Sequence, residues 1–141
     1  MKHLLLVTLL ITSLLGCKKQ EAAPKTPQQL LVGTWYLVKF VERQTSYGTV
    51  SRHDSTGYTL SASPYSVTYH ADGTSSIPGA IANDYNYVPP RMTFTHNGVA
   101  VGTDFTTIIL QLTEHTLVMH VEQVPQVPTT STLDYWYTYE R

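Results

Sequence analysis

Cys17 is the only cysteine of this 141-residue chain, and its surroundings suit acylation of its thiol. It ends the run Leu14-Leu15-Gly16-Cys17, in which the small Gly16 lets a peptidase reach the bond before the cysteine. The apolar segment Leu4 to Leu15 holds only about a dozen residues, whereas a membrane span needs roughly 20. We therefore expect residues 1–17 to be a signal segment that is cleaved before Cys17, leaving fatty acyl chains such as palmitate on that cysteine.

This layout is that of a bacterial lipoprotein signal peptide, which predicts a lipid anchor at the cell envelope. Lys18, Lys19 and Lys25 follow the cysteine, where each can gain roughly 1 kcal/mol from anionic lipid head groups. Lys18 replaces the Asp that commonly retains lipoproteins, which by analogy with other bacteria favours the outer membrane. The alternative is an ordinary secretory signal with a cysteine at its end.

The mature chain is expected to consist of a tether and one domain. Residues 18–29 are polar and include Pro24 and Pro27, which predicts a flexible tether. Residues 30–141 are numerous enough to bury a core without disulfides or metals. This domain has five basic and nine acidic side chains (5 − 9 = −4) and no basic patch, so nucleic acid is not an expected partner.

The side chains of the domain do not predict catalysis. His115 and His120 are five positions apart and would point to opposite faces of one strand, and the other histidines are dispersed, so no metal site is expected. The segment Arg52-His53-Asp54-Ser55 has the residue types of a nucleophilic triad, but neighbouring side chains on an extended chain diverge. A nucleophile elbow and a phosphate-binding glycine loop are absent from the sequence. We expect neither an enzyme nor a cofactor.

The apolar pattern predicts an all-β domain, because Tyr, Thr and Val are plentiful and apolar residues recur at every second position. Residues that share the inward side of the expected strands are Tyr58-Leu60-Ala62, Tyr65-Val67-Tyr69, Met92-Phe94-His96, Ile108-Leu110-Leu112, Leu117-Met119-Val121 and Leu133-Tyr135-Tyr137-Tyr139.

Turn sequences place these strands next to one another. Asp72-Gly73, Asn97-Gly98 and Thr113 to Thr116 predict hairpins, and hence antiparallel neighbours. Thr74 to Pro90 and Val124 to Ser131 are expected to be long loops because they contain prolines. About eight strands with such connections can form two sheets or a barrel. A sheet that closes on itself has no exposed strand edges, and we therefore expect an antiparallel up-and-down β-barrel.

Several motifs in order along the domain are similar to those of lipocalins and lipocalin-like lipoproteins. Gly33-Thr34-Trp35 resembles their first strand, Tyr69 to Thr74 their aromatic-x-x-Asp-Gly-Thr hairpin, and Leu110 to Thr113 with Leu117 to Met119 their late hairpin. The ending Tyr137 to Arg141 resembles their last strand. The resemblance implies a lipocalin-like barrel of about eight strands, open at one end, that holds a small apolar ligand.

The resemblance also implies how the other end of the barrel is closed. The tryptophan of Gly33-x-Trp35 would plug this end and pack against an arginine at the end of the last strand, a position that Arg141 occupies. Stacking of Arg141 on Trp35 would contribute about 0.5 to 2 kcal/mol. The alternative is a C-terminal arginine frayed into solvent.

Aromatic and methionine side chains on the expected inward side form the candidate binding set. They are Tyr58, Tyr65, Tyr69, Met92, Phe94, Met119, Tyr135, Tyr137 and Tyr139. Rings with hydroxyl tips suit a pocket for a small apolar or amphipathic molecule. The same rings can also fill an eight-stranded barrel completely. In that case the domain would be a protein-interaction or structural module of the envelope that displays the loops Ser46–Thr56 and Thr74–Pro90.

Overall fold

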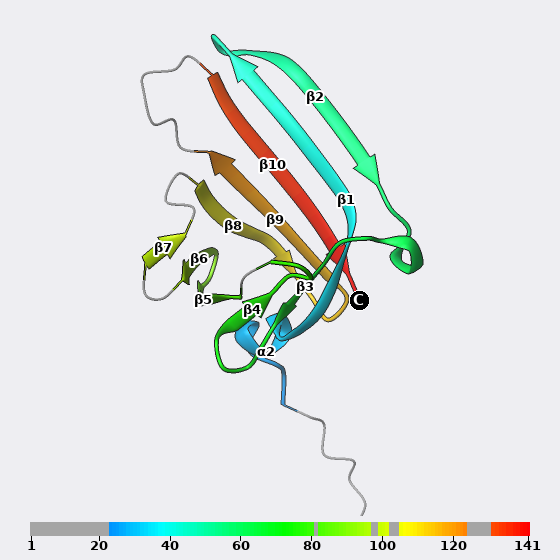
Figure 1. Cartoon of the computed structure of the whole chain (residues 1–141), viewed down its shortest axis with the longest axis vertical. Helices are drawn as coiled ribbons and strands as arrows, with labels where there is room; N and C mark the ends of the chain where they lie inside the picture. The colour runs from blue at the N-terminus through cyan, green and yellow to red at the C-terminus, as the bar shows by residue number, and fades with distance from the viewer. Residues whose placement is uncertain (1–22, 81, 97–98, 102–104, 124–130) are drawn as a thin grey trace, which may run out of the picture.

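The computed structural model describes residues 23–80, 82–96, 99–101, 105–123 and 131–141, and the predicted signal segment 1–17 lies outside these ranges (Figure 1). The described elements are a short helix α2 (Pro27–Leu31), a 3-10 turn η1 (Leu60–Ala62) and the strands β1 (Gly33–Ser46), β2 (Thr49–Gly57), β3 (Ser66–Tyr69), β4 (Thr74–Ser76), β5 (Asn83–Val88), β6 (Arg91–His96), β7 (Val99–Val101), β8 (Phe105–Leu112), β9 (Thr116–Gln123) and β10 (Ser131–Glu140). Within these ranges, no helix has the length and apolar character to cross a membrane.

The strands form a closed antiparallel barrel, as the sequence predicts. The ring runs β1-β3-β4-β5-β6-β8-β9-β10 and closes where β10 pairs with β1. β2 and β3 pair with the same edge of β1, β2 with its second half and β3 with its first four residues. β7 lies outside the ring and pairs with β6. Apart from β2 and β7, which lie outside the ring, its neighbours follow one another in sequence, so the barrel is of the up-and-down type.

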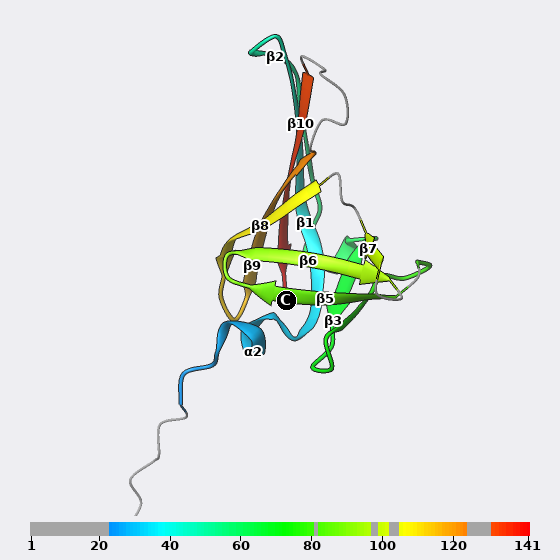
Figure 2. The ribbon, with the colours of Figure 1, turned by 90° about the vertical axis from the view of Figure 1, so that its left-hand side faces the viewer.

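The second halves of β1 and β10 extend beyond the barrel together with β2. Figure 2 shows this narrow sheet rising above β5 and β6, which cross the lower half of the view. The register of β1 against β10 shifts between Leu37 and Lys39, which is a β-bulge. A bulge adds one residue and so changes which residues face inward. Trp35 and Leu37 face the interior below it, and Phe40, opposite Tyr137, shares that side above it.

A second bulge corrects the predicted inward side of β8. The pairing with β9 shifts between Ile109 and Gln111. Ile109 is therefore buried, whereas Leu110, which was predicted to point inward, is 55% exposed.

Two segments predicted to be loops contain strands. The expected loop Ser46–Thr56 includes β2, whose nine residues are all exposed and so give no apolar alternation. Tyr47 and Gly48 connect it to β1 with φ values of 52° and 76°, the backbone that a two-residue hairpin loop requires. The expected loop Thr74–Pro90 includes β4 and β5.

The predicted strand from Tyr58 to Ala62 is wrong, because this segment contains η1. It belongs to an insertion between β2 and β3. Two hydrogen bonds fasten its ends to β1: the Tyr58 N–H donates to the Val38 oxygen at 2.8 Å, and the Leu37 N–H donates to the Tyr65 oxygen at 3.0 Å.

The predicted hairpins at Asp72-Gly73 and Thr113–Thr116 are present. Gly73 has a φ of 88°, and the Asp72 carboxylate accepts hydrogen bonds from the backbone and hydroxyl of Thr74 at 2.9 and 2.7 Å. These bonds lower the pKa of Asp72. The Thr113 N–H donates to the Thr116 oxygen at 2.9 Å. Asn97-Gly98 lies outside the described residues, although the flanking strands β6 and β7 are antiparallel.

The core fills the part of the barrel next to α2. Its buried members are Leu31, Trp35, Val67, Tyr69, Tyr87, Met92, Ile109, Leu117 and Met119. Tyr85, Phe94, Leu112, Tyr137 and Tyr139 pack against them and are partly buried. On β10, Tyr139 and Tyr137 therefore pack against the core, and Tyr135, nearer the extended end of the sheet, is not among its contacts.

Candidate functional site

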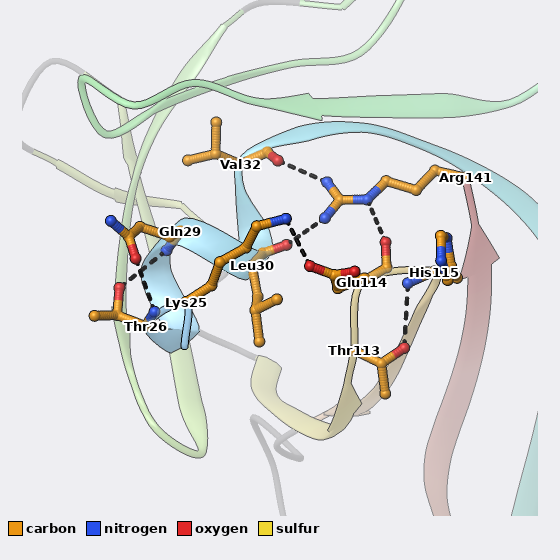
Figure 3. Close-up of polar contacts among 9 residues, drawn as sticks. All are labelled: Lys25, Thr26, Gln29, Leu30, Val32, Thr113, Glu114, His115 and Arg141. Carbon is orange, nitrogen blue, oxygen red and sulfur yellow. Dashed lines mark hydrogen bonds and ion pairs between the residues drawn. The ribbon is translucent and has the colours of Figure 1, made fainter. Parts of the chain in front are cut away.

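Arg141 closes one end of the barrel (Figure 3). Its Nη1 donates to the Val32 oxygen at 2.6 Å, its Nη2 to the Leu30 oxygen at 2.9 Å, and its Nε to the Glu114 oxygen at 2.8 Å. Its Cζ lies 4.1 Å from the centroid of the Trp35 ring. The predicted stacking is therefore present, and the C-terminal arginine joins the last strand to the start of the domain.

Trp35 and Gly33 complete this closed end. Trp35 is fully buried, and its Nε1 donates to the Leu31 oxygen at 2.7 Å. Gly33 has a φ of 129°, and a Cβ at this position would lie 2.6 Å from Nη1 of Arg141. A side chain at residue 33 would therefore displace the guanidinium. Each guanidinium nitrogen of Arg141 and the indole N–H of Trp35 donates to a backbone oxygen, which makes the closed end a structural element.

The tether ends earlier than the sequence predicts. The helix α2 begins at Pro27, and the preceding Thr26 forms a capping box with Gln29. The ammonium of Lys25 also lies 2.7 Å from the Glu114 carboxylate, a contact drawn in Figure 3. Residues 25–29 therefore belong to the folded domain.

Three residues of the candidate binding set lie in the core. Tyr69, Met92 and Met119 are 2%, 2% and 6% exposed, and the Tyr69 hydroxyl contacts the Met119 sulfur at 3.8 Å. Burial raises the pKa of Tyr69, with smaller effects from Tyr139 and Tyr85. Burial likewise raises the pKa of Tyr139. At this level the barrel is filled by its own side chains, as the second interpretation of the sequence requires.

Tyr58 and Tyr65 do not join this set. Their rings pack edge to face with centroids 5.8 Å apart, and Tyr65 is 56% exposed. Both lie at the ends of the insertion between β2 and β3, where the chain leaves the sheet. Their rings thus contact each other, and Tyr65 is largely exposed, so the structure does not bring them together with the other members of the predicted binding set.

Phe40, Tyr135 and Tyr137 form a half-buried group that we call the aromatic face. The Phe40 ring lies 5.2 Å from that of Tyr137 and 5.8 Å from that of Tyr135. Tyr137 also stacks on Tyr139, with centroids 6.2 Å apart. The aromatic face thus continues the core upward onto the inner side of the extended sheet. There its rings are only partly covered by the described residues.

A polar rim lies beyond the aromatic face and consists of Glu42, Arg52 and Asp54. Glu42 is opposite Tyr135 on one side and Asp54 on the other. Arg52 Nε lies 2.6 Å from Asp54 Oδ2, and its Nη1 lies 3.5 Å from Glu42 Oε1. The hydrogen bond to Asp54, followed by the charges of both carboxylates, raises the pKa of Arg52.

The phenols beside this rim remain protonated. Burial, then Tyr135 and Glu42, raises the pKa of Tyr137, and burial followed by Glu42 raises that of Tyr135. Both hydroxyls can therefore donate hydrogen bonds at neutral pH. The aromatic face and the polar rim together offer flat apolar contact next to hydroxyl, carboxylate and guanidinium groups. This combination suits an amphipathic molecule.

Phe40, Glu42, Arg52 and Asp54 were not among the predicted binding residues. Alternation counted from Trp35 puts even-numbered residues of β1 outside, and the bulge reverses this assignment. Arg52 and Asp54 lie in a strand without apolar residues at alternate positions, and therefore without a sequence pattern of its own.

A charged cluster lies on the opposite side of the same strands. The buried Asp134 accepts from Arg43 Nη2 at 2.9 Å and lies 3.0 Å from His120 Nε2. Trp136 contacts both partners, with Arg43 Cζ 4.7 Å and the His120 ring 4.6 Å from its centroid. Burial acts to raise the pKa of Asp134, but the hydrogen bonds from Arg43 and His120 outweigh it, so this pKa is lowered. The cluster links β1, β9 and β10.

Two further features bear on binding. A pocket of about 230 Å³ lies between α2, β8 and the Pro89-Pro90 turn, and Leu30, Tyr87 and Ile109 are among its lining residues. It does not include the aromatic face.

Among the described residues, no three His, Cys, Asp or Glu side chains are grouped in a way that could hold a metal ion.

A scan against known protein families found no match to this chain, and a search of curated proteins found no similar sequence.

Proposed function

We propose that this protein is a lipocalin-like lipoprotein that binds a small amphipathic molecule on its aromatic face while Cys17 anchors it to the cell envelope. The observation that carries the proposal is the row of partly buried rings that continues the core along the inner side of β10. Tyr139 and Tyr137 pack against the core, Tyr135 lies beyond them, and all three rings keep exposed surface. A ligand that covers this exposed aromatic surface removes apolar area from water, which contributes favourably to the free energy of binding.

The filled lower half of the barrel limits the ligand's position. Because Tyr69, Met92 and Met119 occupy that space, a ligand would lie on the aromatic face and not deep in the barrel. Its apolar part would contact Phe40 and Tyr137. Its polar part would meet the phenol of Tyr135 and the polar rim. This arrangement favours a flat or short molecule over a long acyl chain.

The filled core also favours the second function, a protein-interaction or structural module of the envelope. In that case the half-buried rings of the aromatic face would contact a protein partner. Binding of a small molecule separates the two functions, since only the first requires it.

Tyr137→Ala should weaken binding of an environment-sensitive apolar dye to the protein by about tenfold. Removal of a contacting ring costs roughly 1.4 kcal/mol of binding free energy, which corresponds to that factor. Dye fluorescence titrated against the protein measures the dissociation constant, and a short-chain fatty acid or amine should displace the dye from one saturable site.

Tyr65→Ala is the matched control, because it removes an exposed tyrosine whose ring packs on Tyr58 and not on the rings of the aromatic face. It should leave the dissociation constant unchanged. Equal constants for both variants, or absence of saturable binding by the parent protein, would contradict the ligand-binding function and favour the interaction module.

A further inference from the structure

β2 has one unpaired edge in the part of the chain that the structure describes. It is the last strand in the sheet order and pairs only with β1. Figure 1 shows it as the outermost strand of the extended sheet. All nine of its residues are exposed. A strand of this length with free N–H and C=O groups on one side is a template for pairing with another strand.

The sequence of β2 is complementary to itself in one register. If two copies pair antiparallel about a two-fold axis at His53, Thr49 lies opposite Gly57 of the partner subunit by residue count. The regular part of the strand from Arg52 to Gly57 surrounds this axis, and Ser51 is the extra residue where the pairing with β1 shifts register. The same register puts Arg52 opposite Asp54 of the partner subunit, and Asp54 opposite the partner subunit's Arg52. The pairing that gives the greatest overlap thus also joins opposite charges, and cross-strand pairs of opposite charge stabilise a sheet.

The polar rim of a single chain has one positive charge, that of Arg52, against the two negative charges of Glu42 and Asp54. Glu42 and Asp54 are direct cross-strand neighbours, an arrangement that like charges disfavour. Arg52 serves both carboxylates, with a contact of 2.6 Å to Asp54 and a longer one of 3.5 Å to Glu42. Pairing about His53 would bring a second guanidinium, that of the partner subunit's Arg52, beside Asp54. Arg52 would then be released to approach Glu42.

We propose that two copies of this chain associate through antiparallel pairing of their β2 edges, centred on His53. The axis is perpendicular to the sheet, because Arg52 and Asp54 of both copies lie on the inner side. The two extended sheets become one continuous sheet, and both aromatic faces lie on the same side of it. The pairing uses the backbone and the polar rim, so it does not depend on whether the aromatic face binds a ligand.

Disulfide formation in the full-length protein in its membrane tests this register. His53→Cys puts two cysteines opposite each other at the axis, where Cα atoms of paired residues are about 4.5 to 5.5 Å apart, within the range that a disulfide spans. Mild oxidation should therefore convert most of this variant into a dimer on a non-reducing gel, and reduction should reverse it. The parent protein, which retains Cys17, is treated in parallel to give the background.

Ser51→Cys is the matched control in the same strand, at the extra residue where the pairing of β1 with β2 shifts register. Its two copies would be four residues out of register, about 13 Å apart, and should not cross-link. The double variant Ser51→Cys with Ser55→Cys should cross-link, since these positions lie opposite each other. Equal cross-linking of His53→Cys and Ser51→Cys, at either a high or a low level, overturns the proposal.

Charge exchange provides a second, independent test. Arg52→Asp, added to His53→Cys, puts aspartates opposite each other and should reduce the disulfide-linked fraction to the level of the Ser51→Cys control. Further addition of Asp54→Arg restores opposite charges across the axis and should restore the linked fraction. If the double exchange does not recover it, the proposed pairing is wrong.

Discussion

Trp35→Ala should lower the free energy of unfolding by about 3 to 5 kcal/mol, as large-to-small changes in a core do. Trp35 is fully buried, its indole N–H bonds to the Leu31 oxygen, and Arg141 lies over its ring. Its loss would leave both a cavity and a carbonyl without its donor. Domains of this size are stable by only about 5 to 15 kcal/mol, so much of the fold's stability would be lost. Urea denaturation followed by circular dichroism measures the change.

Tyr36→Ala is the control for this substitution, because Tyr36 is the next residue of β1 but is 40% exposed. It should cost much less than Trp35→Ala. Arg141→Met should give an intermediate loss, since it removes three hydrogen bonds to backbone oxygens. A shift of only a degree or two in the melting temperature of Trp35→Ala would mean that the closed end is not held by this residue.

Cys17→Ser should transfer the protein from the membrane to the soluble fraction, or leave it uncleaved. Each buried methylene of an acyl chain contributes roughly 0.8 kcal/mol, so several chains on one cysteine make spontaneous detachment negligible. The serine variant cannot carry the thioether-linked lipid. Fractionation of cells, with incorporation of labelled palmitate, measures the effect and also shows whether the parent protein is in the outer membrane.

Lys19→Ser is the control, because it changes the polar segment after the cysteine but leaves the acylated residue in place. This variant should stay in the membrane. Unchanged partitioning and unchanged labelling of Cys17→Ser would refute the anchor, whatever the aromatic face binds.

The barrel and its closed end could be predicted from the sequence because their determinants are local patterns. Apolar residues alternate at Leu117-Met119 and at Tyr135-Tyr137-Tyr139, which indicates strands with one side facing the core. Gly73 indicates a turn that needs a positive φ. The contact of Arg141 with Trp35 followed from a family resemblance, and the structure contains it.

The extended sheet with its aromatic face could not be predicted, because the pairings that form it are not visible in the sequence of a single strand. The bulge after Leu37 brings Phe40 inward, and it arises from pairing with β10. Strand β2 exists because it pairs with β1, although all its side chains are exposed. The alternation of Tyr58, Leu60 and Ala62 likewise predicted a strand where the structure has the 3-10 turn η1.

Native mass spectrometry of the protein extracted from its own membranes tests the proposed function most directly. The proposal predicts an acylated chain that carries one additional, non-covalent small molecule, and loss of that molecule from the Tyr137→Ala variant while the covalent lipid remains. Detection of the covalently acylated chain alone, with no bound molecule in either the parent or the variant, would contradict ligand binding on the aromatic face.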